Sequence, residues 1–130
     1  MKKLVLIFFI FSTVSVFSQN TDDAISNPDI MPEFPGGSEA LMKFIRSNIK
    51  PISQIKPDTL FAGCRSMVSF VIDKEGIVKN VFIARSCINC NACDTEAIKV
   101  MEKMPKWKPG LQNNKPVPVK MAFPIFFEAK

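Results

Sequence analysis

The chain contains no histidine. This absence removes Cys-His and Ser-His nucleophile pairs, and it removes every metal site that needs an imidazole ligand. The 12 acidic residues are scattered, and no two of them stand at a spacing suited to acid–base catalysis. We therefore expect a protein that is not an enzyme and that uses neither a cofactor nor a small-molecule substrate.

A basic stripe with interleaved aromatic residues, which is typical of nucleic-acid-binding proteins, is also missing. The nearest pattern is Lys106-Trp107-Lys108, which is too short, and we interpret it as a solvated turn with a packed tryptophan. The net charge of +5 falls to +3 if Lys2 and Lys3 are removed with an N-terminal leader. We expect no nucleic-acid partner.

The apolar run at the N-terminus is shorter than the ~20 residues that a transmembrane helix needs. It follows Met1-Lys2-Lys3, covers residues 4–17 and ends at Ser18-Gln19. This order is typical of a secretory signal peptide, here residues 1–18, and an uncleaved inner-membrane anchor is the alternative. The sequence therefore predicts an exported protein.

The rest of the chain divides into an extended lead-in at residues 19–35 and one small domain at residues 36–130. In the domain we predict a helix that Ser38 caps and Pro51 ends, two strands at residues 66–73 and 77–85, and a helix that Asp94 caps. The turn between the two strands contains Gly76. Residues 106–115 are predicted to be a loop before a final strand.

The final strand, residues 116–127, has the clearest pattern in the chain. Every odd position is large and apolar, which indicates one buried face. Pro118 and Pro124 share one parity, so both can direct their missing amides to the same, open side. The sequence thus predicts an edge strand on which Lys120 to Ala122 offer free backbone groups to another extended chain.

Chain direction constrains the sheet. If the first strand runs up and the second down, the second helix returns the chain so that the third strand is antiparallel to the first. The expected fold is a small two-layer α+β domain. Its three-stranded antiparallel sheet has the order 2-1-3 and is covered on one face by two helices. The last strand is then an edge strand, as its prolines require.

Four cysteines in a small exported chain favour two disulfides. The hairpin turn places Cys64 opposite residues 85 and 86, so that Cys87 is the nearest thiol and Cys90 pairs with Cys93; Cys64 with Cys90 stays open as an alternative. Thiolate binding of zinc or an iron–sulfur cluster, and a redox pair at Cys90 and Cys93, are the competing hypotheses.

Several segments together resemble the TonB C-terminal domain family, in the variants found in Bacteroidetes-type bacteria. They are MPEFPGGSEALMKFIR at residues 31–46, VIDKEG at 71–76, MPKWKPG at 104–110, KPVPV at 115–119 and FPI at 123–125. The resemblance covers about residues 31–128. It implies a periplasmic domain, related to TonB-dependent transport, that holds an extended segment of an outer-membrane receptor, the TonB box, by strand addition.

In that family the last strand makes the contact, which here corresponds to a peptide-binding segment of Val119, Lys120, Met121, Ala122 and Phe123. The retained membrane helix and the long Pro-rich spacer of a complete TonB are not recognisable in this sequence. Residues 19–30 span at most ~40 Å when fully extended, which is too short to reach an outer-membrane receptor from the inner membrane. We therefore expect this chain to bind a partner rather than to transduce energy.

Two other partners of the edge strand are alternatives to a receptor. The edge strand could bind another periplasmic protein or a second copy of the chain, since exposed strand edges also pair with themselves. A structural or decoy interaction protein, and a cysteine-based metal or redox carrier on the same scaffold, are the alternative functions.

Overall fold

A computed structural model describes residues 24–51, 55 and 63–128 of the chain. The predicted signal peptide lies outside the described residues, as do the first five residues of the predicted lead-in. The described elements are α1 (Gly37–Asn48), β1 (Cys64–Ile72), β2 (Val78–Arg85), α3 (Asn91–Glu102), β3 (Gly110–Gln112), β4 (Lys115–Val117) and β5 (Val119–Phe127).

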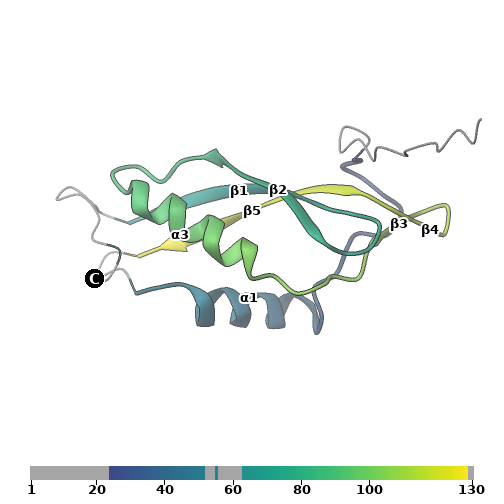
Figure 1. Ribbon diagram of the computed structural model, residues 1–130, viewed down its shortest axis with the longest axis horizontal. Helices are drawn as coiled ribbons and strands as arrows, with labels where there is room; N and C mark the ends of the chain where they lie inside the picture. Colours follow the sequence, from purple (N-terminus) through teal and green to yellow (C-terminus); the bar gives the residue numbers. More distant parts are fainter. Residues whose placement is uncertain (1–23, 52–54, 56–62, 129–130) are drawn as a thin grey trace, which may run out of the picture.

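The main sheet is antiparallel and has the order β2-β1-β5. Strand β5 corresponds to the predicted final strand, so the expected order 2-1-3 and the edge position of that strand are confirmed. Strands β1 and β5 pair in continuous register from Cys64 opposite Phe127 to Ile72 opposite Val119. Figure 1 shows the two helices on one side of this sheet. The predicted α+β fold is confirmed.

The helices divide the sheet between them. Helix α3 lies over β1 and β2, whereas α1 runs beside β5 (Figure 1). The core contains Val68, Phe70 and Ile72 of β1, and it is closed by Val100 and Met101 of α3, all at most 1% exposed. Burial of every second residue in this part of β1, and of Ala97 and Met101 four residues apart in α3, follows the periods of a strand and a helix.

The predicted cap of the first helix is wrong. Helix α1 begins at Gly37 and is preceded by Gly36, whose φ of 91° and ψ of 0° are left-handed. The Gly37 amide donates to the Phe34 carbonyl at 2.8 Å, so that Pro35 and Gly36 form the centre of a type II turn. This turn sets the start of the helix, and Ser38 lies exposed in its first turn.

The predicted cap of the second helix is also wrong. Helix α3 begins at Asn91, and the Sγ of Cys90 accepts a hydrogen bond from the Cys93 amide at 3.2 Å. Asp94 has another role: its Oδ1 accepts from the Cys87 amide at 2.9 Å and from the Ser66 hydroxyl at 2.7 Å. A carboxylate that looked like a local cap instead connects the loop to the sheet.

A second, two-stranded sheet lies where a loop was predicted. Strands β3 and β4 form a hairpin whose turn residues, Asn113 and Asn114, have φ angles of 51° and 61°. Positive φ at both central positions is the geometry of a type I′ turn. The predicted strand at residues 116–127 is therefore two strands, because Pro116 belongs to β4 and the break falls at Pro118.

Candidate functional site

Among the described residues, no strand pairs with the outer side of β5, and a single bridge at Val119 occupies the beginning of that side. Every residue of β5 has a partner in β1, and Pro124, which has no amide proton, lies opposite Met67. The Lys120 amide donates away from β1, to a residue of the lead-in. Amides of the same parity point the same way, so Ala122 and Phe126 also direct their amides outward. Both prolines of this segment therefore have the outward parity, as the sequence predicted.

The chain itself occupies the first part of this edge. Ile25 forms a parallel bridge with Val119, in which its amide donates to Pro118 at 3.0 Å and its carbonyl accepts from Lys120 at 2.9 Å. Farther along the lead-in, Ile30 bridges to Leu111. Lys120 therefore does not offer the free donor that the sequence analysis assumed, and the open part of the edge begins at Ala122.

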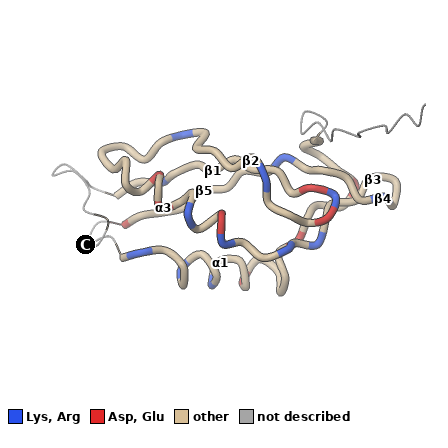
Figure 2. The backbone as a smooth tube through the Cα atoms, in the orientation of Figure 1, with Lys and Arg blue, Asp and Glu red and all other residues tan. Residues whose placement is uncertain are grey.

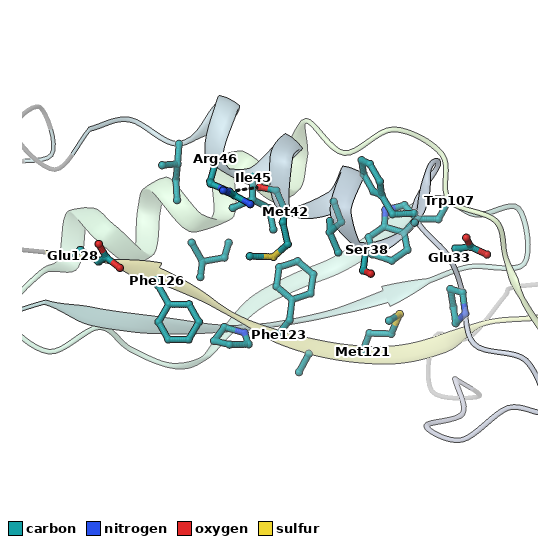
Figure 3. Close-up of a pocket in the computed structure, with 18 residues that line it drawn as sticks. Glu33, Ser38, Met42, Ile45, Arg46, Trp107, Met121, Phe123, Phe126 and Glu128 are labelled. Atoms are coloured by element: carbon teal, nitrogen blue, oxygen red, sulfur yellow. Dashed lines mark hydrogen bonds between the residues drawn. The ribbon is translucent and has the colours of Figure 1, made fainter.

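A groove of about 1050 Å³ runs along the open edge, between β5 and α1. Figure 3 shows Met42 and Ile45 of α1 on one side of it and Met121 and Phe123 of β5 on the other. Met42 is 48% exposed, which is high for a large apolar side chain. The groove thus presents apolar surface directly beside unpaired backbone groups.

Charge is confined to the margins of the groove. Residues 121–127 of β5 include no charged side chain (Figure 2). Glu33 and Glu128 lie at opposite ends, and Arg46 lies on the α1 side, where its Nε donates to the Met42 carbonyl at 3.4 Å (Figure 3). The floor is therefore suited to apolar groups, and the margins to polar ones.

An aromatic cluster closes one end of the groove. The centroid of the Trp107 ring lies 5.5 Å from the ring centroid of Phe34 and 5.9 Å from that of Phe70. Trp107 is 5% exposed, which agrees with the interpretation of a packed tryptophan. Its Nε1 is buried, and no described residue accepts a hydrogen bond from it. The cluster holds the end of the lead-in against the core.

The cysteines form the disulfides Cys64–Cys87 and Cys90–Cys93. The pairing of β1 with β2 contains two register shifts, which help to explain the first disulfide. Near the turn, Ile72 lies opposite Val78, and continuing that register would place Met67 opposite residue 83. Met67 instead lies opposite Arg85, so β2 is displaced by two residues. The shift brings residues beyond 85 alongside the start of β1, and so brings Cys87 close to Cys64.

The hairpin turn contains an ion pair supported by two backbone hydrogen bonds. The carboxylate of Asp73 accepts from the amides of Glu75 and Ile77 at 2.8 and 2.9 Å, and it forms a 2.8 Å ion pair with Lys79. Burial by itself would raise the pKa of Asp73, but the Lys79 hydrogen bond and the two amides together hold that pKa below its ordinary value. This interaction stabilises the turn and lies away from the groove.

Sequence reasoning missed the helical wall of the groove. Leu41 and Ile45 of α1 line the groove, whereas no site residue was predicted on this helix. Exposed Met42, next to that stripe, was the available signal. The full lining comprises Pro32, Glu33, Phe34, Gly37, Ser38, Leu41, Met42, Ile45, Arg46, Ile49, Trp107, Met121, Ala122, Phe123, Pro124, Ile125, Phe126 and Glu128.

Among the residues that the structure describes, no helix is long and apolar enough to cross a membrane. A comparison with curated proteins gives no match. The family model described as "Gram-negative bacterial TonB protein C-terminal" matches residues 62–129, which include every strand of the main sheet and α3. The chain belongs to the TonB C-terminal domain family.

Proposed function

We propose that this protein is a non-enzymatic periplasmic interaction domain that docks an extended, TonB-box-like segment of an outer-membrane receptor by strand addition to β5. Family membership links the chain to interactions in TonB-dependent transport. The observation that carries the finer proposal is the position of the apolar groove, which borders the open amides and carbonyls of the edge strand.

Strand addition uses both features at once. A docked segment would accept hydrogen bonds from the outward amides of Ala122 and Phe126 and would donate to outward carbonyls between them. Pro124 contributes no donor, so the pairing is interrupted there. The lead-in already pairs with the beginning of β5, which leaves the segment from Ala122 onward for the partner.

Side-chain recognition follows from the pleat. In an extended segment paired to β5, alternate side chains would point to the same face as Met121 and Phe123, and hence toward α1. The groove is lined there by Leu41, Met42 and Ile45. The preferred occupant is therefore an extended segment that is apolar at every second position and that has polar residues near its ends.

A single-proline substitution tests this proposal. In the labelled full-length protein, we expect a TonB-box-like receptor peptide to shift the backbone amide resonances of residues 122–127 and of α1. Ala122→Pro should weaken binding about fivefold to tenfold, because it removes one hydrogen bond of about 1 kcal/mol and disturbs its neighbour. Nuclear magnetic resonance titration measures both effects.

The matched control is Ala122→Ser, which keeps the amide and should bind normally. A peptide of the same composition without alternation should give no shifts. Equal binding by folded Ala122→Pro and Ala122→Ser would rule out docking through this edge. Concentration-dependent shifts in the absence of peptide would instead identify a second copy as the occupant.

A further inference from the structure

The four cysteine sulfurs form one cluster at the end of the main sheet opposite the β1–β2 turn. The Sγ atoms of Cys64, Cys87 and Cys93 all lie within 4.8 Å of one another, and Cys90 is bonded to Cys93. Cys87, Cys90 and Cys93 are at most 3% exposed, whereas Cys64 is half-buried.

The spacing of the sulfurs suits a thiophilic cation. With zinc–sulfur bonds of about 2.3 Å, a tetrahedral site has sulfurs about 3.8 Å apart. Cys64 and Cys87 are bonded to each other, and the Cys93 sulfur lies within 4.8 Å of both, so the sulfurs of the two disulfides already lie near this spacing. The ligands would come from the start of β1, the loop after β2 and the first turn of α3.

The surroundings favour thiolates. Cys90 is the N-cap of α3 and Cys93 lies in its first turn, where the helix dipole is favourable to negative charge. The Cys93 amide donates to the Cys90 sulfur at 3.2 Å. A hydrogen bond of this kind stabilises negative charge on sulfur. Asp94 fixes the loop through the Cys87 amide, so the ligand positions depend on more than the disulfides.

We propose that Cys64, Cys87, Cys90 and Cys93, once reduced, bind one Zn²⁺ ion as a tetrathiolate site. The four thiols lose four protons on binding, and the ion takes the place of the two disulfide cross-links in holding the end of the hairpin to α3. This site goes beyond the proposed docking function, and none of its ligands lines the groove.

Reduction needs a dithiol and can proceed inside the folded protein. One dithiol attacks the accessible Cys64 sulfur and Cys87 leaves as a thiolate; the second thiol of the reagent then releases Cys64 and forms the reagent's own disulfide. The Cys87 thiolate attacks Cys93 and frees Cys90. Cys64 then attacks Cys87 and frees Cys93.

A second dithiol reduces the regenerated Cys64–Cys87 bond in the same way. In total, two dithiols give four electrons and four protons and become two disulfides, and the protein gains four thiols. The half-buried position of Cys64 makes it the point at which the reagent enters.

The test is a metal titration of the full-length protein, reduced with a dithiol that is then removed under anaerobic conditions. We expect one Co²⁺ per chain, with the visible bands of tetrahedral cobalt and a near-ultraviolet sulfur-to-cobalt band, and displacement by one equivalent of Zn²⁺. The oxidised protein should bind neither ion, and Zn²⁺ should raise the Tm of the reduced protein.

Variants assign the ligands. Cys64→Ser, at the half-buried position, and Cys93→Ser should each lose the tetrathiolate cobalt spectrum, whereas Ser86→Ala, next to Cys87 and exposed, should retain it. Circular dichroism reports the fold of each variant. A reduced wild-type protein that shows no tetrahedral cobalt spectrum, whether it remains folded or unfolds without recovery on adding Zn²⁺, would overturn the proposal. Unchanged binding by folded Cys64→Ser would do the same.

Discussion

At the scale of single residues, Gly76 has the closest backbone neighbour among the glycines compared in the described part of the chain. Its φ is 85°, and a Cβ at this position would overlap the Trp107 carbonyl oxygen. The Gly76 carbonyl also accepts from the Trp107 amide at 2.8 Å. The hairpin turn and the segment after α3 are therefore joined backbone to backbone, and a side chain would separate them.

We predict that Gly76→Ala lowers the free energy of unfolding by about 2 kcal/mol or more, because the positive φ and the backbone contact are both disfavoured. Urea denaturation measures this loss. The matched control is Gly63→Ala, also at a positive φ of 98° but exposed, where the loss should be smaller. An equal loss at both positions would show that the Trp107 contact contributes nothing.

Asp73 gives a second prediction at the residue scale, for the dependence of stability on pH. Since its pKa is lowered in the folded protein, its contribution is fully present above the unfolded pKa of about 3.9 and is lost as the pH falls through the folded pKa. Asp73→Asn should therefore be less stable than wild type at pH 7, and the two should converge in acid. Urea denaturation of both proteins across this range measures the difference, and a constant difference would contradict the assignment.

At the scale of elements, the lead-in and β5 decide how much of the sheet edge is open. In the part of the lead-in that the structure describes, the bridge at Ile25 involves β5, and two further bridges join Ile30 to Leu111 and Glu33 to Lys108. Loss of the Ile25 bridge would thus lengthen the open edge without detaching the lead-in from the rest of the domain.

We predict that Ile25→Pro selectively exposes the Lys120 amide. The substitution removes the hydrogen bond to Pro118 and weakens the bridge by about 1 kcal/mol, so hydrogen exchange at Lys120 should accelerate about fivefold. The amides of Lys108 and Leu111 should keep their protection, as should all three in Ile25→Ala. Unchanged exchange at Lys120 would show that the lead-in does not restrict the edge.

Short elements also show where prediction from sequence fails. The hairpin of β3 and β4 was missed because strands of three residues are too short to show alternation, and Asn113-Asn114 is a weaker turn signal than Asn-Gly. Local capping rules also misplaced both helix starts. At Asp94 the carboxylate binds groups distant in sequence, which no local pattern reveals.

At the scale of the whole molecule, the two disulfides join the open end of the hairpin and the start of α3 into one unit. Cys64–Cys87 joins residues separated by 23 positions in the sequence, and Cys90–Cys93 joins residues separated by 3. From loop-closure entropy, these correspond to about 3.5 and about 2 kcal/mol of stability. We predict that Cys64→Ser combined with Cys87→Ser lowers the free energy of unfolding by the larger amount, measured by urea denaturation in the absence of reductant.

Cys90→Ser combined with Cys93→Ser is the comparison, with the smaller loss expected from loop closure. Cys90 and Cys93 are both buried in the core, so replacing them with polar serine adds a desolvation cost to the free energy of folding. A double variant at Cys64 and Cys87 that remains as stable as wild type would show that packing alone holds the hairpin end.

The sequence by itself determined the fold class, the strand order and the edge position of the last strand. These follow from period-two burial, from proline positions and from chain direction, all of which are properties of local segments. Only the tertiary structure decided that the lead-in covers Lys120, that α1 and β5 enclose an apolar groove, and that four sulfurs meet at one place. Each of these depends on contacts between segments far apart in the chain. The residue pattern of one segment does not predict how it packs against another.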